Sequence, residues 1–156
     1  MWLSGSWDER DRVVGGKTIK LGSKSGDRVL TELIDQAAQR LTANGSRLVI
    51  VTLAPDAPGT QLAADPSRNR RLAELNRLLR QYATGHHIPV TDLRSIVCPR
   101  TTAGKPCPRM VHGILLRPDG YHFDPGASRF VAEQVLPHVL NPVASAISTT
   151  TRSVKK

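Results

Sequence analysis

The sequence predicts an α/β fold with a parallel sheet and helices on both faces of that sheet. Amphipathic helical segments alternate with short apolar runs, an order typical of βαβ units. The run Arg47–Leu53 is rich in β-branched residues and too short for a helix, so it suits a parallel strand covered on both faces. The 156 residues fit one domain with a core of its own, and no apolar run approaches the ~20 residues that span a membrane.

The first third predicts one strand, one loop and one helix. Trp2–Gly5 is short and apolar, and we interpret it as the end of a strand. Residues Arg10–Gly26 are rich in Gly, Lys and Ser and therefore predict a long loop. A helix follows, with Asp27 as its N-cap, apolar residues at intervals of three and four, and Asn44-Gly45 as its terminator.

The middle third predicts a second helix and a third strand. After the strand Arg47–Leu53 the segment Gly59–Ser67 reads as a loop. Leucines at helical spacing predict an amphipathic helix from about Leu72 that closes near Gly85. Ile88–Leu93 then predicts a short strand, with a proline near its start where a missing backbone donor is tolerated.

The last third predicts a loop with both cysteines, the apolar segment Gly113–Leu116 and a final helix. Asp124 is the expected N-cap of that helix, Pro125 its first residue, and Pro137 its limit. We expect one domain over residues 1–140, followed by a disordered Ser/Thr-rich tail over residues 141–156.

The chain is strongly basic, with 22 Lys+Arg against 13 Asp+Glu and a formal net charge of +9. The basic residues are scattered through several elements, and 2 Trp, 2 Tyr and 2 Phe are few rings for stacking on bases. We therefore expect a solvated basic face and no nucleic-acid partner; attraction to an anionic envelope surface or glycan is the weaker alternative. Charged residues follow Gly5 almost at once, so the N-terminus does not resemble a signal peptide.

The histidines and glycines do not predict a metal or cofactor site. His86 and His87 are adjacent and cannot easily hold one ion together, and His112 and His122 lack partners at ligand spacing. Gly15–Thr18 shares part of a phosphate-binding loop but lacks its first glycine and the preceding strand. We expect neither a metal nor a cofactor.

Asp119 and His122 are the residues most able to carry chemistry. A carboxylate can fix the tautomer of an imidazole and stabilise its protonated form, as the base of a serine nucleophile requires. The alternative is an ordinary turn at Asp119-Gly120 with a surface histidine. The spacing alone favours that turn, because short motifs recur by chance.

The surrounding sequence is more specific than this pair. The segment RPDGYHFDPGASRFVAEQVLPHVL, from Arg117 to Leu140, resembles the last motif block of the SGNH (GDSL-like) hydrolase family, where Asp-x-x-His supplies two members of a catalytic triad. Its form is most similar to the SGNH domains attached to acyltransferase-3 membrane proteins, which take part in O-acylation of cell-envelope glycans. The resemblance implies a three-layer flavodoxin-like fold, with His122 as general base and Asp119 orienting it.

Three further segments resemble the same subgroup, so the resemblance covers about residues 2 to 140: Ser4–Trp7, Val49–Pro55 and the two-cysteine loop Val97–Pro108. It implies that Trp7 lines a substrate pocket or caps the core.

Arg117 has two open interpretations. It faces a substrate oxyanion as a substrate-binding residue, or it pairs with a carboxylate in a structural role, which we favour.

The same resemblance implies a disulfide between Cys98 and Cys107. The subgroup works outside the cytoplasm, where disulfides persist, and the prolines and glycine between the two cysteines favour a closed turn. The alternative is a pair of reduced, partly buried thiols.

The sequence departs from the family at the nucleophile. It contains no Gly-Asp-Ser, since Gly26-Asp27 is followed by Arg28, and Gly5–Asp8 lacks the asparagine that would donate to an oxyanion. We therefore expect the C-terminal portion of an SGNH domain that lacks the first strands and the serine nucleophile. Ser4 and Ser6 lie near a strand end, but a rewired nucleophile is disfavoured because a serine and its base must meet in a narrow geometry.

The expected function is an SGNH-like esterase or O-acyltransferase acting on acyl groups of cell-envelope glycans, inactive as this chain alone. Its expected partners are an acylated glycan or acyl donor and an acyltransferase-3 membrane domain, in an extracytoplasmic or envelope-associated location. The alternative is a non-catalytic α/β module that binds a glycan or a partner.

Overall fold

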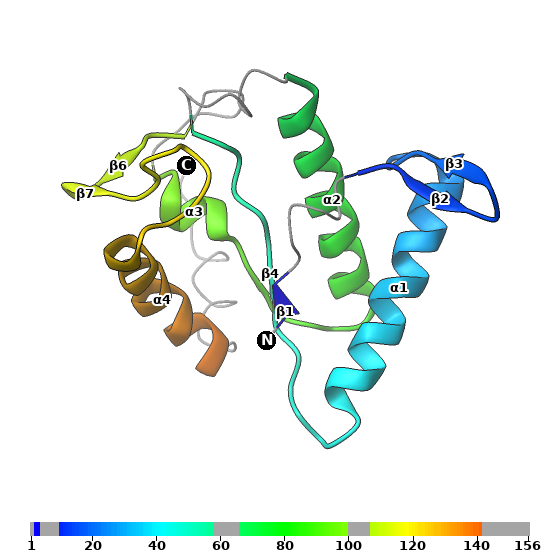
Figure 1. The fold of residues 1–156 in the computed structure, drawn as a ribbon. Helices are drawn as coiled ribbons and strands as arrows, with labels where there is room; N and C mark the ends of the chain where they lie inside the picture. The colour runs from blue at the N-terminus through cyan, green and yellow to red at the C-terminus, as the bar shows by residue number, and fades with distance from the viewer. Residues whose placement is uncertain (1, 4–9, 58–65, 100–106, 142–156) are drawn as a thin grey trace, which may run out of the picture.

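The computed structural model describes residues 2–3, 10–57, 66–99 and 107–141, and every structural statement below concerns these residues (Figure 1). A parallel sheet runs through the middle of the molecule. Its strands are β1 (Trp2–Leu3), β4 (Ile50–Val51) and β5 (Val90–Thr91), in the order β1-β4-β5. Ile50 pairs with Trp2 on one side and with Val90 on the other. The alternation of strands and helices therefore predicted the parallel pairing correctly, in a mixed α/β fold.

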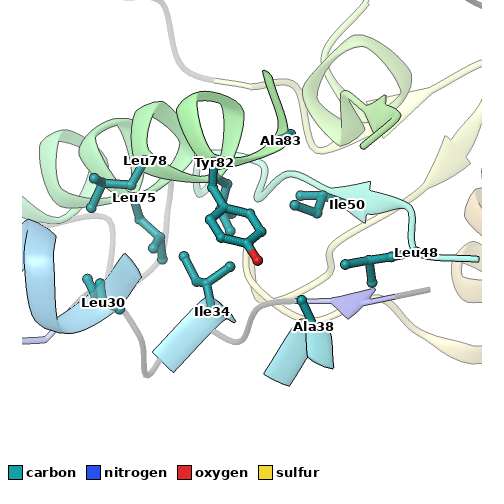
Figure 2. Close-up of a cluster of buried hydrophobic side chains, with 10 residues drawn as sticks. Leu30, Ile34, Ala38, Leu48, Ile50, Leu75, Leu78, Tyr82 and Ala83 are labelled. Atoms are coloured by element: carbon teal, nitrogen blue, oxygen red, sulfur yellow. The ribbon is translucent and has the colours of Figure 1, made fainter. Parts of the chain in front are cut away.

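Two long helices, α1 (Lys24–Thr42) and α2 (Pro66–Gly85), bury their apolar stripes against each other and against β4. We call the buried residues at this contact the first cluster (Figure 2): Leu30, Ile34, Ala38, Leu48, Ile50, Leu75, Leu78, Leu79, Tyr82 and Ala83. Helix α2 ends at Gly85, as the leucine spacing predicted, and begins one to two turns before the predicted start.

A second cluster contains Val51 together with residues of α3 (Leu93–Val97) and α4 (Pro125–Leu140). Successive side chains of a strand point to opposite faces, so Ile50 joins the first cluster and Val51 joins the second. Strand β4 is therefore covered on both faces, which explains why the run around it carries no polar alternation.

The prediction of a loop over Arg10–Gly26 is wrong. The segment contains an antiparallel hairpin of β2 (Arg12–Val14) and β3 (Lys17–Ile19), followed by the first residues of α1. The turn between the strands is Gly15-Gly16, with φ angles of 57° and 75°. A two-residue hairpin turn of type I′ needs positive φ at both central residues, so two adjacent glycines between segments rich in β-branched residues were the signal that could have identified it.

The predicted N-cap of α1 is also wrong. Ser23 caps the helix, and its Oγ accepts the N–H of Gly26 at 3.1 Å. Gly26 is required there, because a Cβ would lie 2.1 Å from the carbonyl oxygen of Lys20. Asp27 instead lies in the first turn and joins α1 to α2 through Arg77, with 2.6 Å between Oδ2 and Nη2. At the other end, Gly45 ends the helix region at φ 78°, as predicted.

The loop predicted between Leu93 and Gly113 contains regular structure. Helix α3 begins after Asp92, whose side chain accepts the N–H of Arg94 at 3.2 Å. A second hairpin joins β6 (Met110–Val111) to β7 (Ile114–Leu115), with His112 and Gly113 at positive φ in its turn. Five residues of helix and two of strand are too short to show a period, which is why the pattern missed them.

Helix α4 begins as predicted and ends later than predicted. Asp124 caps it by accepting the N–H of Ala127 at 2.7 Å, and Pro125 is its first residue. The helix continues through Pro137 to Leu140, so that proline does not limit it. Proline lacks a donor but keeps its carbonyl, and the carbonyl of Pro137 accepts the N–H of Asn141 at 3.0 Å. Within the described residues, no helix combines the length and the apolar character needed to cross a membrane.

Candidate active site

Asp119 and His122 form a hydrogen-bonded pair in the loop between β7 and α4. Asp119 Oδ2 lies 2.7 Å from His122 Nδ1, and Asp119 Oδ1 accepts the backbone N–H groups of Tyr121 at 2.8 Å and His122 at 2.7 Å. The bond from His122 and then these two backbone bonds lower the pKa of Asp119 to about 2. The carboxylate is therefore ionised at neutral pH, so Nδ1 carries the proton and donates to it.

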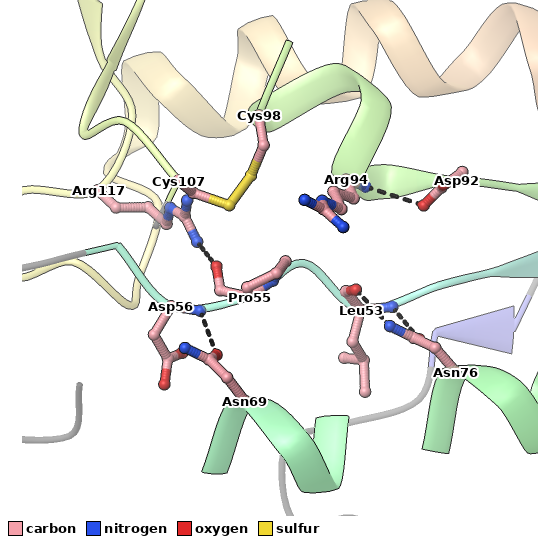
Figure 3. Close-up of a disulfide and its surroundings, with 10 residues drawn as sticks. All are labelled: Leu53, Pro55, Asp56, Asn69, Asn76, Asp92, Arg94, Cys98, Cys107 and Arg117. Carbon is pink, nitrogen blue, oxygen red and sulfur yellow. Dashed lines mark hydrogen bonds between the residues drawn. A yellow bond between two sulfur atoms is a disulfide. The ribbon is translucent and has the colours of Figure 1, made fainter. Parts of the chain in front are cut away.

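Two contacts fix this loop at the carboxyl end of the parallel sheet. The N–H of Ala57, six residues beyond β4, donates to the carbonyl of Gly120 at 2.9 Å. Arg117 Nη1 donates to the carbonyl of Pro55 at 2.5 Å (Figure 3). In open α/β sheets, reactive groups gather at this end of the strands. Trp7, which we expected nearby, lies outside the described residues, as do Ser4 and Ser6.

Arg117 is 2% exposed, and it makes its hydrogen bond to a backbone carbonyl rather than to a carboxylate. Burial lowers the pKa of its guanidinium, while the charges of Asp56 and Asp119 act in the opposite direction. Within the described residues, Nε and Nη2 of Arg117 are buried without a hydrogen-bond partner. Arg117 therefore joins the segment after β4 to the loop of the Asp119–His122 pair, through a backbone carbonyl and not through the carboxylate that the structural interpretation expected.

A cavity of about 290 Å³ lies beside His122. Its walls come from the segments after β4 and β5, from α2 and from the His122 loop: Leu53, Ala54, Asp56, Arg68, Leu72, Leu93, Arg117, Tyr121, His122 and Phe123. The His122 side chain is 74% exposed, so a ligand in the cavity can reach the imidazole. A concave site with a few polar groups on apolar walls is the usual form of a small-molecule site.

Sequence reasoning missed a buried ion pair in the wall of this cavity. Arg68 Nε lies 2.5 Å from Asp56 Oδ2, and the two side chains are 9% and 3% exposed. The Arg68 guanidinium carbon lies 4.9 Å from the centroid of the Tyr121 ring, which meets the His122 ring edge-on at 4.4 Å. Tyr121, from the same loop, therefore contacts the imidazole directly, and behind it lie Arg68 of α2 and Asp56 of the segment after β4. No local motif carries this signal, because the partners are far apart in the chain.

Cys98 and Cys107 form a disulfide, which confirms the predicted pairing. Their Cα atoms are 5.0 Å apart, and both residues are buried in the second cluster. Leu116, which directly precedes Arg117, is buried in the same cluster as both cysteines, so the disulfide lies near the start of the His122 loop.

The other histidines lie elsewhere. His86 stacks on Tyr82 at 4.1 Å, and His112 lies 6.3 Å from the Phe130 ring. The described part of the chain contains no group of three or more His, Cys, Asp or Glu side chains placed to hold a metal ion. Comparisons with known protein families, with curated proteins and with solved structures found no match to this chain.

Proposed function

We propose that His122 is the general base and then the general acid, and Asp119 the carboxylate that orients it, in an SGNH-like esterase or O-acyltransferase site that acts on acyl groups of cell-envelope glycans. The observation that carries the proposal is the 2.7 Å contact between His122 Nδ1 and Asp119 Oδ2 at the edge of a cavity. It supports the role because a carboxylate on Nδ1 leaves Nε2 as the basic nitrogen that a serine hydroxyl needs.

The proposed chemistry needs no cofactor. A serine Oγ attacks the ester carbon while its proton passes to His122 Nε2, and the imidazolium then protonates the leaving alkoxide as the ester C–O bond breaks. Water or a glycan hydroxyl next attacks the acyl-serine and gives its proton to the same nitrogen. The bond between the acyl carbon and serine Oγ then breaks, and the imidazolium returns the proton to Oγ. Asp119 keeps its negative charge throughout and stabilises the imidazolium.

The serine in this proposal comes from a Gly-Asp-Ser segment outside residues 1–156. Within the described residues, Asp119 is the hydrogen-bond partner of the His122 ring, and no serine bonds to it. A chain with the base but without the nucleophile lacks the group that forms the acyl-enzyme.

The fold and the location belong to the same proposal. We propose that the α/β fold is a three-layer flavodoxin-like one, a view favoured by the helices on both faces of β4. The disulfide favours an extracytoplasmic or envelope-associated location, since such bonds persist in oxidising compartments. The proposed partners are an acylated glycan or acyl donor and an acyltransferase-3 membrane domain, and no nucleic acid.

The test compares two versions of the protein in the hydrolysis of p-nitrophenyl acetate. We expect negligible turnover by residues 1–156 and clear turnover by a longer version with an upstream Gly-Asp-Ser segment, abolished by His122→Ala. His112→Ala is the matched control and keeps the activity, because His112 lies in the β6–β7 turn. Turnover by residues 1–156 that vanishes in His122→Ala contradicts the proposal and makes Ser4 or Ser6 the nucleophile. A longer version that stays inactive also contradicts it.

A non-catalytic binding module is the second candidate. The observation that favours it is the same lack of a serine at the His122 ring within the described residues. Such a module binds acylated glycan fragments in the His122 cavity without releasing the acyl group. Mass spectrometry of the glycan after incubation with the longer version separates the two functions, since only the enzyme changes the mass of the glycan by one acyl group.

A further inference from the structure

A second cavity lies against helix α4 on the Val51 side of the sheet. Its volume is about 250 Å³, and its walls are the side chains of Val51, Leu93, Phe123, Ser128, Val131, Ala132, Val135 and Leu136. No charged residue is among them. The residues from α4 follow the i, i+3, i+4, i+7, i+8 spacing of one helix stripe, so the helix presents a continuous, nearly apolar wall.

This apolar cavity adjoins the cavity of His122. Leu93 and Phe123 line both of them, and Phe123 directly follows His122 in the chain. Val131 and Val135, at 9% and 8% exposure, form buried walls, whereas Leu136 is 46% exposed. A molecule whose polar end lies beside His122 therefore has an apolar space within reach past Phe123.

We propose that the apolar cavity holds the alkyl chain of the acyl group, so that the site takes esters of medium-chain fatty acids. The inference rests on the proposed function, because that function places the acyl carbonyl beside His122. Apolar walls and absent charges favour a hydrocarbon over a sugar, whose hydroxyl groups would lose their hydrogen bonds there.

The size of the cavity sets the length of the alkyl chain that it holds. An apolar cavity of about 150 Å³ accommodates the six carbons of benzene. At the same ratio, a cavity of this size accommodates about ten carbons.

The test uses 1-alkanols from butanol to decanol as neutral probes and measures their binding to residues 1–156 by NMR. We expect the affinity to rise about fourfold for each added methylene up to about ten carbons, because each buried methylene contributes a constant free energy. We also expect nuclear Overhauser effects between the probe chain and the methyl groups of Val131 and Val135. An affinity that does not depend on chain length, or effects confined to other residues, overturns the proposal.

A cavity-filling variant supplies the specific control. Ala132 is exposed on α4 and lines the cavity, so Ala132→Phe fills the space and is expected to weaken decanol binding at least tenfold. Ala73→Phe places the same ring on the exposed side of α2 and is expected to change binding less than twofold. If Ala132→Phe unfolds the chain, Ser128→Leu, also in the cavity wall, replaces it.

The outcomes separate this inference from the proposed function. Alkanol binding is measured without turnover, so its failure leaves the esterase assay standing. A longer version that is inactive but still binds decanol at α4 contradicts the proposed esterase function and supports the apolar cavity as a binding site. A dimer that becomes monomeric in Ala132→Phe shows that a second copy covers the cavity, and this overturns the alkyl-chain assignment.

Discussion

The two clusters on either side of β4 are built differently. In the first, two long helices meet through large apolar side chains, of which Leu75 and Leu79 are each 1% exposed. The second combines one long helix, a five-residue helix and two hairpin strands, and contains the disulfide. The buried guanidinium of Arg117, in the same half of the molecule, donates to the carbonyl of Pro55 (Figure 3). The first cluster is therefore held mainly by apolar packing, with polar contacts between α1 and α2 at its edge, such as the Arg77–Asp27 ion pair and the bond from the Tyr82 hydroxyl to Asp35. The half of the molecule that carries His122 depends in addition on a disulfide and on the bond from the buried Arg117 to the Pro55 carbonyl.

Truncation of the first cluster is expected to have the largest effect on stability. Leu75→Ala removes a fully buried side chain between α1 and α2 and should lower the free energy of unfolding by about 3 kcal/mol. Urea denaturation followed by circular dichroism measures the change. Leu140→Ala, at a position that is 70% exposed, is the control and should stay within about 0.5 kcal/mol. A loss below about 1 kcal/mol for Leu75→Ala would show that this cluster is loosely packed.

Removal of the disulfide tests the second cluster and is expected to have the second-largest effect on stability. Replacing both Cys98 and Cys107 by Ser should cost about 2–3 kcal/mol, because the open loop gains entropy in the unfolded chain. Hydrogen exchange should increase at Val97 and Leu116 in the second cluster more than at Ile34 in the first. Equal increases in both clusters would mean that the two halves unfold as one unit. Alkylation of two thiols in the unreduced protein would contradict the disulfide itself.

The caps of α4 and α1 provide a smaller, matched pair of changes. Asp124→Ala and Ser23→Ala each remove one acceptor from a backbone N–H of the first turn, so each should cost about 1 kcal/mol. Thermal unfolding measures both losses, and Asp124→Asn, which keeps an acceptor, should recover most of the first. A much larger loss of stability for Asp124→Ala would show that this cap is energetically coupled to the other polar contacts around the second cluster.

The pH dependence of Asp119 is the smallest expected effect. Its pKa falls from the usual 3.8 to about 2 in the folded chain, so ionised Asp119 favours folding above pH 3.8 and this contribution is lost as the pH falls towards 2. The side chain is 54% exposed, so the effect on stability should be slight. The carboxyl carbon shift of Asp119 should titrate with a midpoint near 2. A midpoint at 3.8 would show that the contact with His122 does not form in solution.

The sequence predicted the elements whose ends depend only on neighbouring residues. The start of α4 was predicted correctly because the Asp124 cap and the fixed φ of Pro125 both act within one helical turn. The cap of α1 was missed, since Ser23 and Asp27 are both good N-caps, and the structure shows the Oγ of Ser23 accepting the N–H of Gly26. The first hairpin was missed although Gly15-Gly16 carried its signal.

In the candidate site too, the contacts between residues close in the sequence were predicted, and the contacts between distant residues were not. Asp119 and His122 are three residues apart, and the turn between them brings carboxylate and imidazole together through local hydrogen bonds. The bond from Arg117 to the Pro55 carbonyl joins residues 62 positions apart, and no local sequence pattern predicts a contact over that distance. The support from Asp56 and Arg68 depends equally on how α2 lies against β4.

The sequence by itself determined the parallel order of strands and helices, the start of α4, the disulfide pairing and the close placement of Asp119 and His122. These features follow from periodicity, from capping chemistry or from resemblance in short segments. Only the tertiary structure decided which face each cluster covers, that Arg117 is a buried tie, and that two cavities meet at Leu93 and Phe123. The physical reason is that burial and cavities belong to the contact between elements, whose side chains come from distant parts of the chain.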